Sequence, residues 1–413
     1  MKSKKWSLLA TSLTAMVLMA ACAQSTTTSN TNATTNNATT TSTKANQTSY
    51  FTEKDYDTSY DESTASKIEL SGSSADVSGD GATVSGSTVT ITKSGTYVIS
   101  GQSDGVQIKV EADKSTDVHL VLKGATMINT NAAISATSAG HVYLTLAEGT
   151  TNSLSDSSSN SDEKADAALF SKVDLTINGK GTLNVEGKKN NGIKANDTLH
   201  ITGGTYNITA VGDAFNVNDE LNITGTTMTI DAKEDGVKVD NDEDTSVGTM
   251  YLSNNNNITV TAGDDGIHAS GNLVIDSGTY TVKNSTEGLE GKSITINGGD
   301  ITIYSTDDGV NAANKNAQQS EIFFTMNGGN LTVEVGQGDT DPIDSNGNIT
   351  VTGGTIKMIG QTGFDFDGTA TYTGGDIYLN GEKQTEIVNS MPGGGGPQGG
   401  GPQGGGPAPG GQG

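Results

Sequence analysis

Eight copies of a short motif place acidic or polar side chains at regular intervals along the chain. Each copy has an acidic or polar residue, then Gly, Ala or Pro, then one apolar residue, as in Asp235-Gly236-Val237. Between Asn191 and Phe364 the middle residues are separated by 22, 22, 30, 22, 21, 33 and 21 positions. A period in this range with occasional insertions is typical of a solenoid, so the motif predicts a column with one carboxylate per coil.

The first residue of the motif is acidic in most copies, and a second acid precedes three of them, as Glu234, Asp264 and Asp307. Carboxylates stacked about 5 Å apart on neighbouring strands would repel by roughly 3 kcal/mol per pair at an effective dielectric near 20. They can splay into water, stay protonated or share a cation, and Ca²⁺ accepts carboxylate and carbonyl oxygens in flexible geometry. The sequence therefore predicts calcium ligands, first Asp235, Asp264, Asp265, Asp307 and Asp308, then Asp213, Glu287 and Asp341. The simpler alternative is that Asp is a favoured corner residue.

The elements that would position these acids are short strands. Apolar and polar residues alternate in runs such as Leu199-His200-Ile201 and Tyr206-Asn207-Ile208, and paired glycines such as Gly298-Gly299 separate the runs. Three strands and three corners per repeat predict an all-β fold, a single-stranded parallel β-helix of about eleven coils between residues 90 and 380. A β-sandwich also has many short strands, but it would not give a persistent column in register.

The apolar residue that ends each motif should point into the β-helix. Because it holds the same place in every coil, we expect one continuous interior stack. Its members are Ile193, Phe215, Val237, Ile267, Leu289, Val310, Ile343 and Phe364.

The two ends of the chain differ from the repeats. A basic start and a short apolar run, residues 1–21, predict a signal peptide that is followed by Cys22, and Leu18-Met19-Ala20-Ala21-Cys22 resembles a bacterial lipoprotein lipobox. We expect lipidation of Cys22 and an extracytoplasmic protein anchored to the cell membrane; the alternative is a free thiol in a discarded peptide. Residues 22–65, rich in Ser, Thr and Asn, predict a disordered tether, 66–390 the β-helix, and 391–413 a disordered Gly/Pro-rich tail.

Composition excludes several classes of function. The net charge is −25, with 48 acidic residues against 23 basic ones, and every basic residue is Lys. Nucleic-acid binding needs a basic face, so we exclude it. The four histidines are isolated in the sequence, and no local zinc or iron motif is present. We expect a monomer.

Together, the lipobox, the polar tether, the Asp-Asp-Gly coils and the Gly/Pro-rich tail make the chain similar to a bacterial family of carbohydrate-binding β-helices. The best matches are Ala262–Ile267 and Ser305–Val310. The resemblance implies a right-handed, pectate-lyase-like β-helix that binds calcium together with cellulose or acidic plant polysaccharides.

Three functions remain open at this point. The first is polysaccharide binding at the cell surface, with Ca²⁺ bridging protein and uronate carboxylates. The second is a calcium-dependent polysaccharide lyase, in which Lys238, or else Lys194, would be the base. The third is a structural adhesin or spacer.

Overall fold

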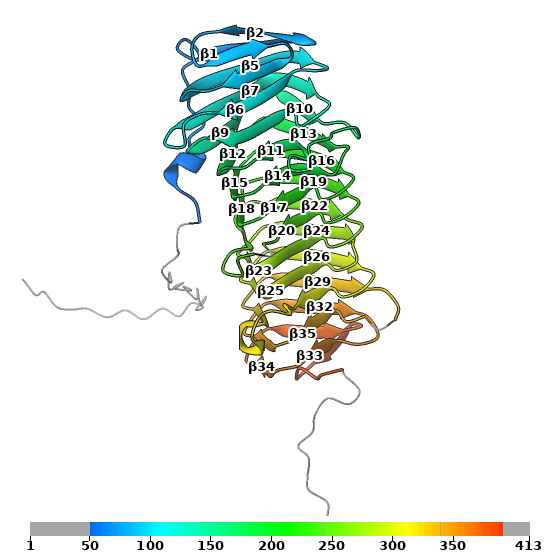
Figure 1. Ribbon diagram of the computed structural model, residues 1–413. Coiled ribbons are helices and arrows are strands. Elements are labelled where there is room, and N and C mark those ends of the chain that lie inside the picture. Colours follow the sequence, from blue (N-terminus) through cyan, green and yellow to red (C-terminus); the bar gives the residue numbers. More distant parts are fainter. Residues whose placement is uncertain (1–49, 242, 339, 391–413) are drawn as a thin grey trace, which may run out of the picture. The chain divides into compact units, whose positions relative to one another are not determined.

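The structure is a computed structural model that describes residues 50–241, 243–338 and 340–390 (Figure 1). Its strands form coils that stack on one another, and the coils share three parallel sheets. We call these sheets I, II and III in the order in which each coil visits them. This arrangement confirms the predicted parallel β-helix.

Sheet I carries the acidic motifs. Its strands are β4 (Thr88–Ile91), β6 (Gln107–Glu111), β8 (Ile134–Ser138), β11 (Ala167–Ser171), β14 (Asn191–Ala195), β17 (Phe215–Val217), β20 (Val237–Val239), the first parts of β23 (Ile267–Ile275) and β25 (Leu289–Ile296), β27 (Val310–Ala312), β30 (Ile343–Ser345) and β33 (Phe364–Phe366). One strand per coil gives twelve coils over the described residues, close to the predicted eleven.

Sheet II follows sheet I around each coil. Its strands are β1 (Ser66–Gly72), β5 (Gly95–Ser103), β7 (Asp117–Ile128), β9 (His141–Leu146), β12 (Leu175–Gly179), β15 (Thr198–Thr202), β18 (Glu220–Thr224), β21 (Thr249–Leu252), the ends of β23 and β25, β28 (Phe323–Met326), β31 (Asn348–Val351) and β34 (Ala370–Tyr372).

Sheet III completes the coil. It contains the ends of β5 and β7, then β10 (Thr151–Ser155), β13 (Thr182–Gly187), β16 (Thr205–Ala210), β19 (Thr227–Ala232), β22 (Asn257–Thr261), β24 (Thr279–Asn284), β26 (Asp300–Ser305), β29 (Asn330–Val335), β32 (Thr355–Ile359) and β35 (Asp376–Leu379).

The core is a set of apolar columns inside the coils. The predicted interior stack is confirmed: its eight side chains, from Ile193 to Phe364, are between 0 and 3% exposed. Adjacent members face each other in register, as Val237 and Ile267 do. Burial of one apolar face per strand holds the coils together, because no coil can bury its inner face alone.

The paired glycines form the corner between sheets II and III. Gly354 has a φ of 81°, which favours glycine, and a Cβ there would lie 2.8 Å from the backbone of the coil before it. The corner therefore needs glycine both for its backbone conformation and for its close stacking.

Antiparallel pairs lie at the two ends of the stack. β2 (Ser74–Ser78) pairs with β1, β3 (Ala82–Ser85) pairs with β4, and β36 (Glu382–Gln384) pairs with β35. Such hairpins cover strand edges that could otherwise pair with another chain. Among the described residues, no helix is long and apolar enough to cross a membrane.

Residues 50–65, which we call the strap, pack on the outer face of sheet II and contain the short helix η1 (Glu53–Tyr56). Asp55 is 1% exposed and accepts a hydrogen bond from Thr176 Oγ1 at 2.6 Å. Tyr50 stacks on Tyr251, with ring centroids 3.6 Å apart. The prediction of a disordered tether is therefore wrong for residues 50–65. The rest of that predicted tether lies outside the described residues, as do the predicted signal peptide, Cys22 and the Gly/Pro-rich tail.

Candidate functional site

The outer edge of sheet I carries two parallel columns of polar side chains. The first column contains the corner residue of each motif. The second contains the residue three places later, which is the central, outward residue of the following strand, as in Asp235 and Lys238. In order, the second column reads Lys194, Asn216, Lys238, His268, Glu290, Asn311, Asp344 and Asp365, and adjacent members are register partners. The two columns together form a ladder of ionisable groups.

Backbone hydrogen bonds link the corner acids from coil to coil. Asp213 Oδ1 accepts from the N–H of Asp235 at 2.9 Å, and Asp235 Oδ1 accepts from the N–H of Asp265 at 2.9 Å. Asp308 Oδ1 accepts from the N–H of Asp341 at 2.8 Å. Hydrogen bonds to a carboxylate stabilise its charged form, so the backbone relieves part of the repulsion between the stacked acids.

In the upper part of the ladder, the second column supplies side-chain donors. Asp235 is 1% exposed, and its Oδ2 lies 2.7 Å from Lys238 Nζ. Burial lowers the pKa of Lys238, but the hydrogen bond and charge of the Asp235 carboxylate have the larger effect and raise it overall. Asp265 Oδ2 likewise lies 3.1 Å from His268 Nδ1, and Asn216 donates to Asp213 Oδ2 at 2.6 Å. We call the corners from Asp213 to Asp265, with these partners, the compensated segment.

The lower part of the ladder has Glu290 and Asp344 where the upper part has Lys238 and His268, although Asn311 donates to both carboxylate oxygens of Glu287 at 3.0 Å. Burial and the charge of Glu290 raise the pKa of Glu287 to about 8. Burial and the neighbouring carboxylates raise the pKa of Asp308 to about 6 and that of Asp344 to about 7. We call the corners from Glu287 to Asp341, with Glu290, Asn311 and Asp344, the uncompensated segment. The raised pKa values favour protonation of Glu287 and Asp344 near neutral pH, whereas Glu290 contacts His268 of the preceding coil.

Two groups of side chains bring potential metal ligands together. Asp235, Asp264 and Asp265 place carboxylate oxygens within 4.8 Å of one another, and Asp265, His268 and Glu290 do the same with one nitrogen. Three of the five calcium ligands predicted first thus meet at one place. Within the described ranges, Asp213, Glu287, Asp307, Asp308 and Asp341 belong to no such group, and Asp307 is exposed. The sequence alone did not indicate the second group.

A groove of about 430 Å³ opens beside this ladder at the corner between sheets I and II. His268, Ser270 and Glu290 line it from the short corners of β23 and β25. Residues from two longer loops also line it: one loop follows β20, and the other, which includes η2 (Gln319–Glu321), follows β27. The lining is rich in amide groups, from Asn241, Asn314, Asn316 and Asn346. We call this hollow the corner groove.

Both loops are tied to the floor of the groove. Asn241 N–H donates to Ser270 Oγ at 3.3 Å, and Asn314 Nδ2 donates to the Ser270 carbonyl oxygen at 2.9 Å. Asn241 Nδ2 also donates to Asp219 Oδ1 at 2.8 Å. The sequence predictions missed this groove, although the motif spacings of 30 and 33 signalled the insertions that form it.

The two lysines considered as lyase bases are both engaged in ion pairs. Lys238 pairs with buried Asp235, and Lys194 Nζ lies 2.7 Å from Asp166 Oδ1. A general base must be unprotonated and free to reach its substrate. The raised pKa of Lys238 keeps it protonated.

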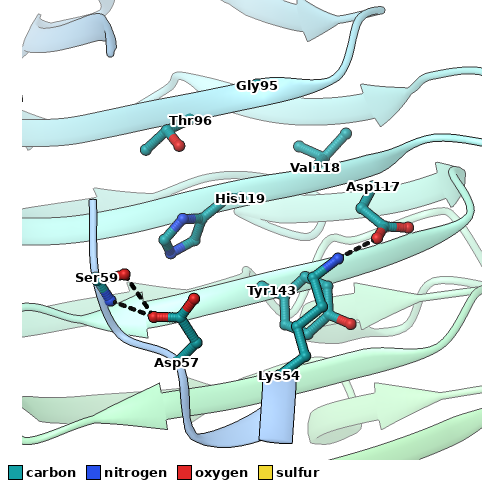
Figure 2. A pocket seen from close by; sticks show the side chains of 9 residues that line it. All are labelled: Lys54, Asp57, Ser59, Gly95, Thr96, Asp117, Val118, His119 and Tyr143. Atoms are coloured by element: carbon teal, nitrogen blue, oxygen red, sulfur yellow. Dashed lines mark hydrogen bonds and ion pairs between the residues drawn. The ribbon is translucent and has the colours of Figure 1, made fainter. Parts of the chain in front are cut away.

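A smaller pocket of about 230 Å³ lies between the strap and sheet II (Figure 2). Lys54 of the strap pairs with Asp117 and lies over the ring of Tyr143, 4.5 Å from its centroid. Ser59 donates to Asp57 in the same wall. These contacts bind the strap to the sheet, so we assign this pocket a structural role.

Comparison with known proteins places the chain in a family. Residues 85–340 match the family model described as carbohydrate-binding domain-containing protein. A relative of the same description from Acetivibrio thermocellus is 36% identical over 125 residues, which cover 29% of this chain and 44% of the relative. The match thus spans less than half of that relative's length. A solved structure described as a polysaccharide lyase-like protein from C. thermocellum, in a gadolinium derivative, aligns at 23% identity and a TM-score of 0.38, over 75% of this chain and 99% of that one. On the extent of the family match, the chain belongs to the carbohydrate-binding domain-containing protein family.

Proposed function

We propose that this protein holds polysaccharide at the cell surface and that the corner groove is where the glycan lies. The observation that carries the proposal is the groove itself, whose two loops present several amide side chains beside carboxylates. Amides and carboxylates can donate to and accept from sugar hydroxyls, and a few convergent polar groups suffice to orient a ligand. We propose cellulose or acidic, pectin-like glycans as the ligand class.

Calcium is the proposed cofactor. The oxygen-only group Asp235, Asp264 and Asp265 suits a hard cation, and Asp264 is exposed enough for access from solvent. In the uncompensated segment, the crowded carboxylates would gain a counter-ion when Ca²⁺ binds. A bound Ca²⁺ on this edge could also accept a uronate carboxylate, which would favour acidic glycans.

We propose binding without cleavage, because Lys238 and Lys194 are occupied by Asp235 and Asp166. The test is retention of the full chain on cellulose and on polygalacturonate, with calcium or chelator, together with the release of unsaturated sugar. Retention without product is expected. Release of product would establish a lyase, and neither retention nor product would favour the adhesin or spacer.

Matched variants locate the glycan site. Asn316 and Asn346 are exposed residues of the groove lining, so Asn316→Ala and Asn346→Ala should weaken retention severalfold without loss of folding. Asn257→Ala removes an exposed amide from sheet III and is the control. Equal retention of all three variants and the parent would place the glycan elsewhere.

We also propose that a lipid on Cys22 anchors the protein outside the cytoplasm. Cys22→Ser should leave an unprocessed or released protein in cell fractions. Fractionation and processing like the parent's would reject the anchor.

A further inference from the structure

Three side chains from two adjacent coils meet at the floor of the corner groove. One ligand atom from each of Asp265, His268 and Glu290 lies within 4.8 Å of the others. His268 Nδ1 is 3.1 Å from Asp265 Oδ2 and also pairs with Glu290 Oε2. One nitrogen therefore faces two carboxylate oxygens, so a single bound cation would contact all three groups.

The donor set differs in kind from the neighbouring acids. Ca²⁺ is bound almost entirely by oxygen, whereas imidazole nitrogen suits Zn²⁺, Ni²⁺ and Cu²⁺. Two carboxylates also balance the charge of a divalent ion bound by a neutral imidazole. We propose that Asp265, His268 and Glu290 form a site for a divalent transition-metal ion such as Zn²⁺, which shares Asp265 with the proposed oxygen-only calcium site but adds a nitrogen ligand.

The backbone pre-positions these ligands. His268 and Glu290 are register partners on β23 and β25, so their side chains leave the sheet next to each other. Asp265 lies at the corner three residues before His268, and its N–H is held by Asp235 Oδ1 at 2.9 Å. Ligands fixed by a sheet need little rearrangement to enclose an ion.

The site has an open side. His268 and Glu290 line the corner groove, and the side chains of the three ligands are 12, 17 and 23% exposed for Asp265, His268 and Glu290 respectively. Three protein ligands with one accessible position are typical of metal sites that bind an exogenous oxygen. Water would fill that position, or a glycan oxygen would do so if the glycan occupies the groove. Only this last step rests on the proposed function.

Isolated histidines in the sequence gave no sign of this site, because its ligands do not form a local motif. The corner places Asp265 beside His268, and coil stacking brings in Glu290, 22 residues further along the chain. The fold thus brings together potential metal ligands that include a nitrogen, although the sequence contains no local zinc-binding motif.

The first test is calorimetric titration of Zn²⁺, without any glycan, into the chelator-treated full chain in the presence of excess calcium. We expect His268→Asn and Glu290→Gln to weaken Zn²⁺ binding at least tenfold. Glu334→Gln, which changes an exposed acid of β29 on sheet III, should bind Zn²⁺ like the parent. Unchanged Zn²⁺ affinity in His268→Asn, or full displacement of Zn²⁺ by calcium, would overturn the proposal.

The second test needs no variant and covers the case in which His268→Asn does not fold. The chain has four histidines, so labelled imidazoles give four signals in an NMR spectrum. Substoichiometric Ni²⁺ should broaden one imidazole signal before the others. Uniform broadening, or none, would contradict the site. Because both tests omit glycan, failure of polysaccharide binding would leave their outcome unaffected.

Discussion

The compensated and uncompensated segments share one backbone and one motif, yet their electrostatics differ. In both, a corner acid precedes a buried apolar residue, and the outward residue of the strand follows three places after the acid. Where that residue is Lys238 or His268, the corner acid has a cation at 2.7 or 3.1 Å. Where it is Glu290 or Asp344, carboxylates crowd together and the pKa of Glu287 rises to about 8. The outward residue therefore decides whether a side-chain cation faces the corner acid.

The largest expected effect tests whether the two segments differ only in charge. Ile267 and Leu289 are 1 and 0% exposed in adjacent coils, one in each segment. Ile267→Ala and Leu289→Ala should each lower the free energy of unfolding by about 2 to 5 kcal/mol, because each leaves a core cavity. Chemical denaturation measures both. A cost well below this range for Leu289→Ala alone would mean that packing also separates the segments.

The next largest effect is expected when a substitution removes a counter-ion from the compensated segment. Lys238→Met leaves the Asp235 carboxylate buried without its cation and should destabilise the fold by about 3 kcal/mol, at the low end for buried pairs because the lysine side chain is 29% exposed. Lys233→Met breaks an exposed pair with Asp231 and should cost about 1 kcal/mol or less. A similar loss of unfolding free energy in the two variants would contradict a difference between the Lys238–Asp235 pair and an exposed ion pair.

A smaller effect concerns pH in the uncompensated segment. The pKa of Glu287 is raised from 4.5 to about 8 in the folded protein, so its favourable contribution is complete below 4.5 and is lost as the pH rises through about 8. Glu287→Gln stays neutral, so in chelator it should raise the Tm by a few degrees near pH 9 and change it little near pH 4. In the compensated segment, burial lowers the pKa of His268, but the carboxylates of Asp265 and Glu290 raise it overall from 6.5 to about 10. The favourable contribution of His268 is therefore lost at a higher pH, as the pH rises through about 10. A Glu287→Gln variant with the parent's pH profile would contradict a protonated Glu287.

The sequence was sufficient to predict the coils and the interior stack because both depend on local alternation and a fixed period. It also predicted that Asp235, Asp264 and Asp265 would lie close together, at equivalent corners of two adjacent coils. It could not show the role of the outward column, since the contact of His268 with Glu290 depends on the register between coils. The prediction for the strap failed because its sequence was grouped with the preceding stretch of Ser, Thr and Asn. The strap differs from that stretch in its aromatic residues, Tyr50, Phe51, Tyr56 and Tyr60, and their local concentration was the signal that it packs on the β-helix.

The most direct measurement is the Tm of the parent and of Asp344→Lys, each with chelator and with millimolar calcium. A cation that binds only the folded state raises the Tm, and calcium should do so more than magnesium, which loses its waters reluctantly. Asp344→Lys supplies a cation to the uncompensated segment, so it should raise the Tm in chelator and reduce the further gain from calcium. Glu334→Lys makes the same acid-to-lysine change at an exposed position of sheet III and should change neither response. Identical melting of the parent with chelator and with calcium, or equal behaviour of the two lysine variants, would contradict the account.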